Sequence, residues 1–374
     1  MKTFYYLKGK IAVVAILFIT LVLVSCQKDK VSSSLEDIRI STASTVNLPL
    51  GDSLVIKAVA PAGLDYTSEW IVDGKLLSET DSLVFRKYKA GTYNVLFRAI
   101  SGRQIWNREV EVQVQPISVA PNLASRIYVT RLFEFMPAPG QFINKNPGSL
   151  ESAAGILGKK GIVSLGAWGG YIVLGFDHKV INTTNAHDII IYNNAMASSA
   201  EPGVVWVMED RNGNGLPDDI WYEIGGSARG TAGYIRNYAV TYIRPDSVTG
   251  DVPWKDNKGN AGVVKTNAFH TQSYFPLWVE GREYTMTGTC LPSSNINTTN
   301  PAYIISAPFG YGYADNTNGG DKIDLADAID EDGKGISLSG IHFIKIQTGI
   351  QANMGWLGEL STEVLGVADA SLVK

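Results

Sequence analysis

The sequence has few of the residues that usually build compact chemical sites. Its 374 residues include two cysteines and four histidines. Two cysteines are too few for a disulfide framework or a Cys-rich zinc site. The histidines are scattered without metal-ligand spacing, at His178, His187, His270 and His342. No Gly-x-Ser-x-Gly elbow, His-Glu-x-x-His helix or phosphate-binding loop occurs. We therefore expect a binding protein and not an enzyme.

Basic clusters are also missing. The chain has 32 Lys and Arg against 36 Asp and Glu, for a formal net charge of −4. Residues 1–25 hold three lysines and no acid, so the rest of the chain is more acidic still. Binding to nucleic acid depends on clustered positive charge. The composition therefore argues against a nucleic-acid partner.

The N-terminal segment has the pattern of an export signal. Three lysines precede an apolar run from Ile11 to Val24, which is shorter than the ~20 residues of a membrane-spanning helix. The run ends in Leu23-Val24-Ser25-Cys26, which resembles the lipobox of bacterial lipoproteins. The resemblance implies a signal peptide over residues 1–25, lipidation of Cys26 and anchoring in a membrane. Gln27, where a retention-type Asp would stand, favours the outer membrane, with the chain facing the cell exterior.

Short alternating apolar runs, with 38 glycines, 17 tyrosines and 8 tryptophans, predict an all-β fold. After a tether over residues 26–40, residues 41–115 have the pattern of a small β-sandwich. Two pieces resemble PKD or Ig-like modules: Glu69–Gly74, a Trp followed by an Asp-Gly turn, and the strand Gly91–Arg98. Trp70 is expected in the core of this sandwich. Pro116 and Pro121 then mark a short linker. Residues 122–374 are expected to form a larger, jelly-roll-like β-sandwich that binds the ligand.

The stretch Glu201–Glu223 combines a strand with a polar loop. Asp210, Asn212 and Asn214 stand at positions 1, 3 and 5, and Gly215 at position 6, as in the first half of an EF-hand calcium loop. Trp221 replaces the bidentate Glu at position 12. The expected ligands of a structural calcium ion are therefore drawn from Asp210, Asn212, Asn214, the Leu216 carbonyl, Asp218 and Glu223. The alternative is a β-turn with solvated acids.

Two further segments are rich in candidate residues. Trp254–Trp278 mixes aromatic, amide and imidazole side chains, which suits a binding surface as well as a hairpin packed through its aromatic residues. Residues 315–332 are acidic. We expect those acids to form mostly a solvated face, with a second cation site as the alternative.

Three motifs together carry a resemblance to a known family. They are Glu201-Pro-Gly-Val-Val, the loop from Asp210 to Glu223, and Gly358-Glu359-Leu-Ser-Thr-Glu363. The chain resembles surface lipoproteins with a PKD-like module and a C-terminal β-sandwich. Within that family it is similar to the BtuH class of vitamin B12-binding lipoproteins. The resemblance implies capture of cobalamin at the cell surface and its delivery to a TonB-dependent outer-membrane transporter.

No ligand-contacting residue transfers from the family by motif, so the candidates come from side-chain chemistry. The expected cobalamin contacts are Trp168, Tyr171, Tyr192, Trp254, Asn267, Phe269, His270, Gln272, Tyr274, Phe275 and Trp278. A glycan-binding surface lipoprotein of a polysaccharide-uptake system is the alternative, because exposed aromatic rings near calcium also suit sugars. A calcium-stabilised hydrolase or adhesin accessory domain is a third interpretation.

Overall fold

The structure is a computed structural model, and it describes residues 37–374. Strands are the main regular elements of the described chain, which has one short α-helix, α1 (Leu150–Ala154), and a few 3-10 turns. The all-β prediction is confirmed. No helix in this part of the chain is long and apolar enough to cross a bilayer. The predicted signal peptide, Cys26 and most of the tether lie outside the described residues.

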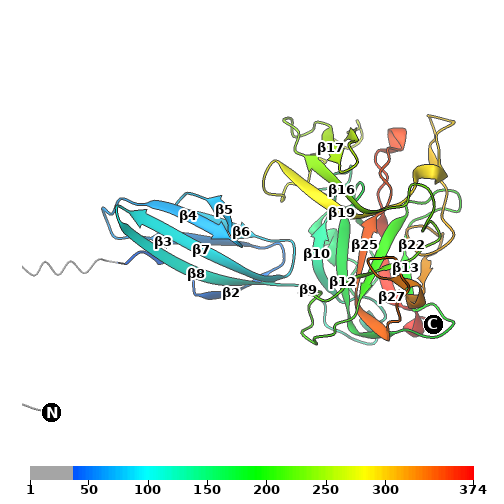
Figure 1. The fold of residues 1–374 in the computed structure, drawn as a ribbon, viewed down its shortest axis with the longest axis horizontal. Coiled ribbons are helices and arrows are strands. Elements are labelled where there is room, and N and C mark those ends of the chain that lie inside the picture. The colour runs from blue at the N-terminus through cyan, green and yellow to red at the C-terminus, as the bar shows by residue number, and fades with distance from the viewer. Residues whose placement is uncertain (1–36) are drawn as a thin grey trace, which may run out of the picture. The chain divides into compact units, whose positions relative to one another are not determined.

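The N-terminal strands form two sheets, drawn in blue to cyan in Figure 1. All strand pairs in them are antiparallel except one. The larger sheet contains, in spatial order, β2 (Thr45–Pro49), β8 (Gln104–Gln115), β7 (Gly91–Ser101), β4 (Thr67–Val72) and β5 (Lys75–Ser78). The smaller sheet contains β1 (Arg39–Ile40), β3 (Ser53–Val59) and β6 (Ser82–Arg86). Along β4, exposed and buried side chains alternate, as expected for a strand with one face on a core.

The Asp-Gly turn and the core tryptophan are where the sequence predicted them. Asp73 and Gly74 join β4 to β5 with φ values of 47° and 82°. Two left-handed residues make the tight turn that matches the twist of a hairpin. Trp70 is fully buried, lies 4.6 Å from the Phe97 ring centroid and donates a hydrogen bond from Nε1 to the Thr80 carbonyl at 2.8 Å.

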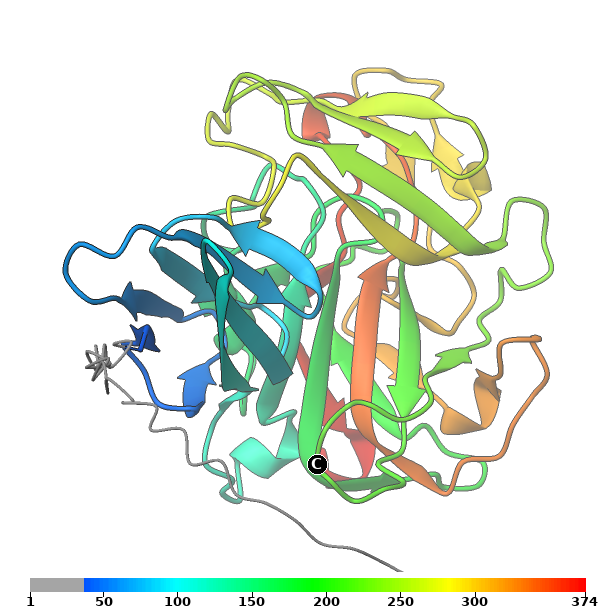
Figure 2. The same cartoon turned by 60° about the vertical axis from the view of Figure 1, so that its left-hand side comes forward.

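An eight-stranded sheet organises the rest of the chain. In spatial order its strands are β24 (Ala328–Ile329), β15 (Tyr222–Ile224), β14 (Gly203–Met208), β25 (Gly340–Thr348), β12 (Tyr171–Ile181), β10 (Arg131–Met136) and β9 (Ile117–Ser118), with β22 (Tyr313–Ala314) paired to β14. Figure 2 shows β25, in orange, between two long green strands. Strand β9 lies inside the predicted linker and pairs with β10. Residues 38–374 form one compact unit, so the domain boundary at 115–122 stays a prediction.

Two smaller sheets complete the architecture. The first contains β23 (Asp321–Ile323), β13 (Ile189–Tyr192) and β27 (Gly366–Asp369), and its buried Ile189 and Val367 share one apolar core with Ile172 and Ile344 of the large sheet. This is sheet-on-sheet packing. The second contains β18 (Ala261–Val264), β17 (Val252–Asp256), β16 (Ile235–Ile243) and β19 (Glu283–Cys290). Two short pairs remain: β11 (Val163–Ser164) with β26 (Glu363–Val364), and β20 (Ile296–Asn297) with β21 (Ile305–Ser306).

Replacing Trp70 tests the packing of the N-terminal sheets. We expect Trp70→Ala to lower the free energy of unfolding by about 3–5 kcal/mol, because it removes a buried ring and leaves a cavity. Leu76→Ala on the neighbouring strand β5 is the control, since Leu76 is exposed and its loss should cost within about 0.5 kcal/mol. Urea unfolding followed by circular dichroism measures both variants. A loss below 1 kcal/mol for Trp70→Ala contradicts the core assignment.

Candidate functional site

A cavity of about 490 Å³ brings together four loops that are far apart in the sequence. The loops follow β10, β13, β18 and β25, and all four connect strands of the C-terminal sheets. The lining residues are Gln141, Phe142, Pro147, Ile162, Asn194, Met196, Ser199, Glu201, Asn267, Phe269, His270, Met354, Trp356, Leu357, Glu359, Ser361 and Glu363. The cavity therefore combines apolar, amide and carboxylate side chains.

The apolar lining residues form an exposed rim. Phe269 is 78% exposed and Trp356 is 55% exposed, and Met196 is exposed beside them on the same cavity. The Trp356 ring is held by a hydrogen bond from Nε1 to the Ala302 carbonyl at 2.7 Å. Large aromatic side chains exposed together at a cavity are typical of ligand-binding surfaces.

An Asn-centred turn holds Phe269 in the open. The Asn267 side-chain oxygen accepts hydrogen bonds from the backbone N–H groups of Phe269 and His270, each at 3.0 Å. Its Nδ2 donates to Gln141 Oε1 at 3.1 Å, which ties the turn to the loop after β10. A side chain bonded to the backbone two and three residues ahead stabilises a turn. The exposed ring thus projects from a turn fixed by hydrogen bonds.

His270 lies at the same turn and is held in one neutral form. Its Nδ1 accepts a hydrogen bond from Lys145 Nζ at 2.9 Å, and its ring meets Phe142 edge-on at 5.1 Å. Burial and the charge of Lys145 lower the His270 pKa. With Nδ1 accepting, the ring proton of neutral His270 sits on Nε2. His270 can therefore donate a hydrogen bond to a ligand carbonyl.

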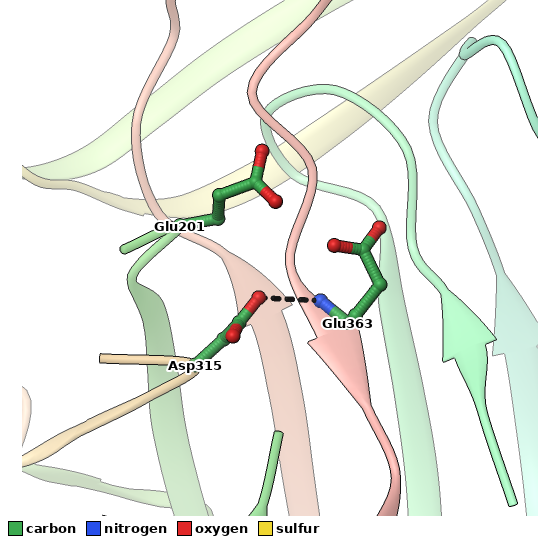
Figure 3. Close-up of side chains that lie close together, drawn as sticks. All are labelled: Glu201, Asp315 and Glu363. Carbon is green, nitrogen blue, oxygen red and sulfur yellow. Dashed lines mark hydrogen bonds between the residues drawn. The ribbon is translucent and has the colours of Figure 1, made fainter. Parts of the chain in front are cut away.

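Two carboxylates, those of Glu201 and Glu363, lie at the floor of the cavity, and that of Asp315 lies behind them. Glu201 precedes β14, Asp315 follows β22 and Glu363 begins β26, and Figure 3 shows their side chains directed toward one another. One oxygen from each of the three lies within 4.8 Å of the others. Within residues 37–374, no Lys, Arg or His forms an ion pair with any of them. The three form a cluster of acids without a basic partner.

Backbone and hydroxyl groups hold the three acids in place. Glu363 N–H donates to Asp315 Oδ2 at 2.9 Å. Ser361 donates from its backbone N–H to Glu201 Oε1 at 3.2 Å and from its hydroxyl to Glu363 Oε1 at 3.0 Å. Burial, and then the neighbouring negative charges, raise the pKa of Glu201 and of Asp315. Burial also raises the pKa of Glu363.

Glu359 adds a fourth buried acid at the edge of this floor. Its Oε1 accepts from Gln141 N–H at 2.8 Å, whereas its Oε2 has no hydrogen-bond partner. Burial raises the pKa of Glu359 to about 7. A buried acceptor without a donor is costly, and such groups cluster at functional sites.

The structure separates the predicted cobalamin contacts. It brings Asn267, Phe269 and His270 to the cavity, and Gln272 lies behind them, donating to the Gln141 carbonyl. Trp168, Tyr274 and Phe275 are fully buried in the core beneath the four-stranded sheet. Their placement corrects the expectation of an open aromatic surface, because apolar packing already covers these rings.

The remaining candidates lie at other places. Tyr171 and Trp278 line a different cavity of about 340 Å³, and Trp254 lines one of about 160 Å³. Tyr192 is covered by Lys160, whose Nζ lies 3.3 Å from its ring centroid. The set predicted from the Trp254–Trp278 composition is therefore not one surface.

Most acids of the segment after β22 are partly or fully exposed, as expected for a mostly solvated face, but two are not. Asp315 and Asp321 are buried. Asp321 accepts from the backbone N–H groups of Asn316 and Thr317 and from the Asn193 amide, so its carboxylate organises the turn after β22. Burial raises its pKa to about 6. Hydrogen bonding within the turn explains why Asp321 is not on the surface.

The loop predicted to hold calcium is closed by its own hydrogen bonds. Asp210 accepts from the N–H groups of Gly213 and Gly215, at 2.8 and 2.9 Å. The Asn212 side-chain oxygen accepts from the Asn214 N–H, and that of Asn214 accepts from the Leu216 N–H. Both Asn side chains donate to the Asp218 carboxylate. Glu223 is elsewhere: it accepts from Tyr234 and Thr289 in a buried network, which corrects its assignment to this loop.

Glu201, Glu359, Glu363 and Trp356 line the cavity and were not predicted as site residues. A signal for the acids was present. Glu201, Glu359 and Glu363 fall in two of the three motifs that carried the family resemblance, each acid between apolar or hydroxyl residues. The structure brings those two motifs to one cavity floor.

No protein-family model and no curated protein matches the chain. Among solved structures, a quinonprotein alcohol dehydrogenase-like protein from Bacteroides thetaiotaomicron aligns at 10% identity and a TM-score of 0.22, over 62% of this chain and 50% of that one. The three N-terminal domains of the Highly Immunogenic Outer Capsid protein of bacteriophage RB49 align at 10% identity and a TM-score of 0.19, over 62% and 66%. The chain thus spans less than two thirds of either structure, and likenesses this low carry no conclusion about activity.

The pKa of Glu359 predicts a specific pH dependence. A carboxyl whose pKa rises from 4.5 unfolded to about 7 folded stabilises the protein fully below pH 4.5, and this contribution is lost as the pH rises through 7. We expect the unfolding free energy of the native protein to fall by on the order of 3 kcal/mol more than that of Glu359→Gln between pH 4.5 and pH 8. Urea unfolding at both pH values in chelator measures this.

Glu201, Asp315 and Glu363 titrate in both proteins, so the difference between the two profiles reports on Glu359 and its coupling to Glu363. Gln keeps the acceptor for the Gln141 N–H, so the turn after β10 is preserved. Identical pH profiles for the two proteins contradict the buried-acid assignment.

Calcium in the Asp210–Asp218 loop stays a prediction, and chelation tests it. If the loop holds a structural ion, chelator lowers the melting temperature, and Asp210→Asn removes the part of that shift that comes from the loop. Binding to the folded state alone is worth about 2.7 kcal/mol at a hundredfold excess over Kd. A melting curve that is unchanged by chelator favours a turn closed by hydrogen bonds alone.

Proposed function

We propose that the chain is a surface lipoprotein that binds cobalamin non-covalently in the 490 Å³ cavity, without catalysis, and passes it to a TonB-dependent outer-membrane transporter. The single observation that carries the cavity assignment is the meeting of exposed Phe269 and Trp356 with a floor of amides and carboxylates. The lipobox-like ending at Cys26 supports anchoring in the outer membrane on the exterior face.

The chemistry of the lining matches that of cobalamin. A corrin is a broad ring system edged by carboxamide groups, each with N–H donors and a carbonyl acceptor. Glu201, Glu359 and Glu363 offer acceptors for amide N–H groups, while Asn194 and the Nε2 proton of His270 offer donors for amide carbonyls. Phe269 and Trp356 supply apolar area for the ring faces. Cobalamin is larger than the cavity, so part of it would rest on the exposed rim.

A glycan is the second candidate, and the same carboxylates favour it. Sugar hydroxyls donate to carboxylates, and sugar rings stack on exposed aromatic side chains such as Trp356. Cobalamin remains the first choice because, within the family that the three motifs indicate, the chain as a whole resembles the cobalamin-binding class, and because the rim is more apolar than polar.

Calorimetry with cyanocobalamin and a panel of oligosaccharides tests the proposal. We expect saturable binding of cyanocobalamin to the purified protein. Phe269→Ala and Trp356→Ala should each weaken it by about 1–3 kcal/mol, or roughly 5- to 150-fold in Kd, as expected for aromatic anchors. Tyr311→Ala is the matched control, because Tyr311 is 54% exposed and is not a lining residue of this cavity. No binding of any corrinoid, or saturable binding of an oligosaccharide instead, overturns the proposal.

A further inference from the structure

The carboxylate floor has a second property, which does not depend on what occupies the cavity above it. Three acids from separate segments converge, with one oxygen from each lying within 4.8 Å of the others. The donors around them are few: the Glu363 N–H bonds to Asp315, Ser361 bonds to Glu201 and Glu363, and the Asn194 and Ser164 side chains bond to Glu363. The cluster therefore has more acceptors than donors.

Asp315 shows this excess most clearly. Its side chain is fully buried, and its Oδ1 has no hydrogen-bond partner, while its Oδ2 accepts from Glu363 N–H. Figure 3 shows one oxygen of this carboxylate facing the Glu363 backbone nitrogen, with the Glu201 and Glu363 carboxylates on the same side. A buried carboxylate oxygen without a donor costs free energy unless a proton or a cation meets it. In the described chain no basic side chain supplies that charge.

We propose that Glu201, Asp315 and Glu363 bind one divalent cation of the calcium class. The three residues offer oxygen donors only, which hard cations prefer and which zinc and copper sites usually supplement with His or Cys. Three carboxylates, each able to bind through one or two oxygens, suit the six to eight ligands of Ca²⁺. Mg²⁺ is usually bound through one or two carboxylates and keeps several waters.

The surroundings leave room to complete the coordination. Glu201 and Glu363 line the 490 Å³ cavity, whereas Asp315 lies behind them, so water can reach the ion from the cavity side. The ion would join the start of β14, the end of β22 and the start of β26. It would neutralise the charge that otherwise opposes burial of the three acids. This site is separate from the Asp210–Asp218 loop and shares no residue with it.

Calcium titration of chelator-treated protein tests the proposal, with Asp315→Asn as the variant and Asp210→Asn as the matched control. Asp315→Asn keeps the shape of the side chain and an oxygen for the Glu363 N–H. We expect calcium to bind the native protein and raise its melting temperature, with Mg²⁺ at equal concentration giving a smaller rise. Asp315→Asn should weaken this binding at least about tenfold, whereas Asp210→Asn should leave a site of native affinity. Calcium binding that Asp315→Asn leaves intact, or no calcium binding by the native protein, overturns the proposal.

A second measurement covers the case in which the variant does not fold. Crystals of the native protein soaked in terbium, a trivalent stand-in for calcium, would give an anomalous peak where the ion binds. A peak between Glu201, Asp315 and Glu363 supports the site. Peaks at other positions only, or none, show that protons and not a metal ion satisfy these carboxylates.

Discussion

The pairing of β25 with strands on both sides fixes the geometry of the cavity. Its residue Thr348 lies opposite Gly203 of β14, while Gln347 lies opposite Tyr171 of β12. Glu201 stands two residues before Gly203, so this register sets its position. The loop that leaves β25 returns to Glu363, and on its way the Thr362 hydroxyl donates to the Glu201 carbonyl at 2.8 Å. Because a slip of one residue would turn every side chain to the other face, the ladder determines which acids meet.

Local features of the fold could be predicted because neighbouring residues determine them. The Asp73-Gly74 hairpin follows from two residues that tolerate positive φ, and Trp70 from its place in an alternating strand. The Asn267–His270 turn also depends on adjacent residues. Its three predicted contact residues, Asn267, Phe269 and His270, all line the cavity. In contrast, Ser361 N–H bonds to Glu201 across 160 positions, and no local pattern encodes that contact. Tyr274 and Phe275 lie outside any strand, so alternation gave no way to separate buried rings from exposed ones.

The buried acids differ in how many hydrogen-bond donors surround their carboxylates. Asp321 has three donors and uses them to shape a turn, whereas Asp315 and Glu359 each keep an oxygen without a partner. Acidic composition alone cannot distinguish these cases, because the donors come from elsewhere in the fold. The net charge of the chain also does not indicate which acids are buried together. The three acids of the proposed cation site are a small minority of the 36 in the chain, and they have few donors and no ion pair among the described residues.

The hydrogen bonds of the Asp210–Asp218 loop also bear on how the protein ages. Asn-Gly pairs deamidate readily when the glycine nitrogen attacks the preceding side-chain amide, and this loop contains two such pairs, at 212–213 and 214–215. Both glycine N–H groups are bound by the Asp210 carboxylate, and both Asn side chains are held by Asp218. The attacking nitrogen and its target are therefore each engaged elsewhere, and the attack requires the loop to open first. The carboxylate that closes the turn is therefore expected to slow deamidation at both Asn-Gly pairs.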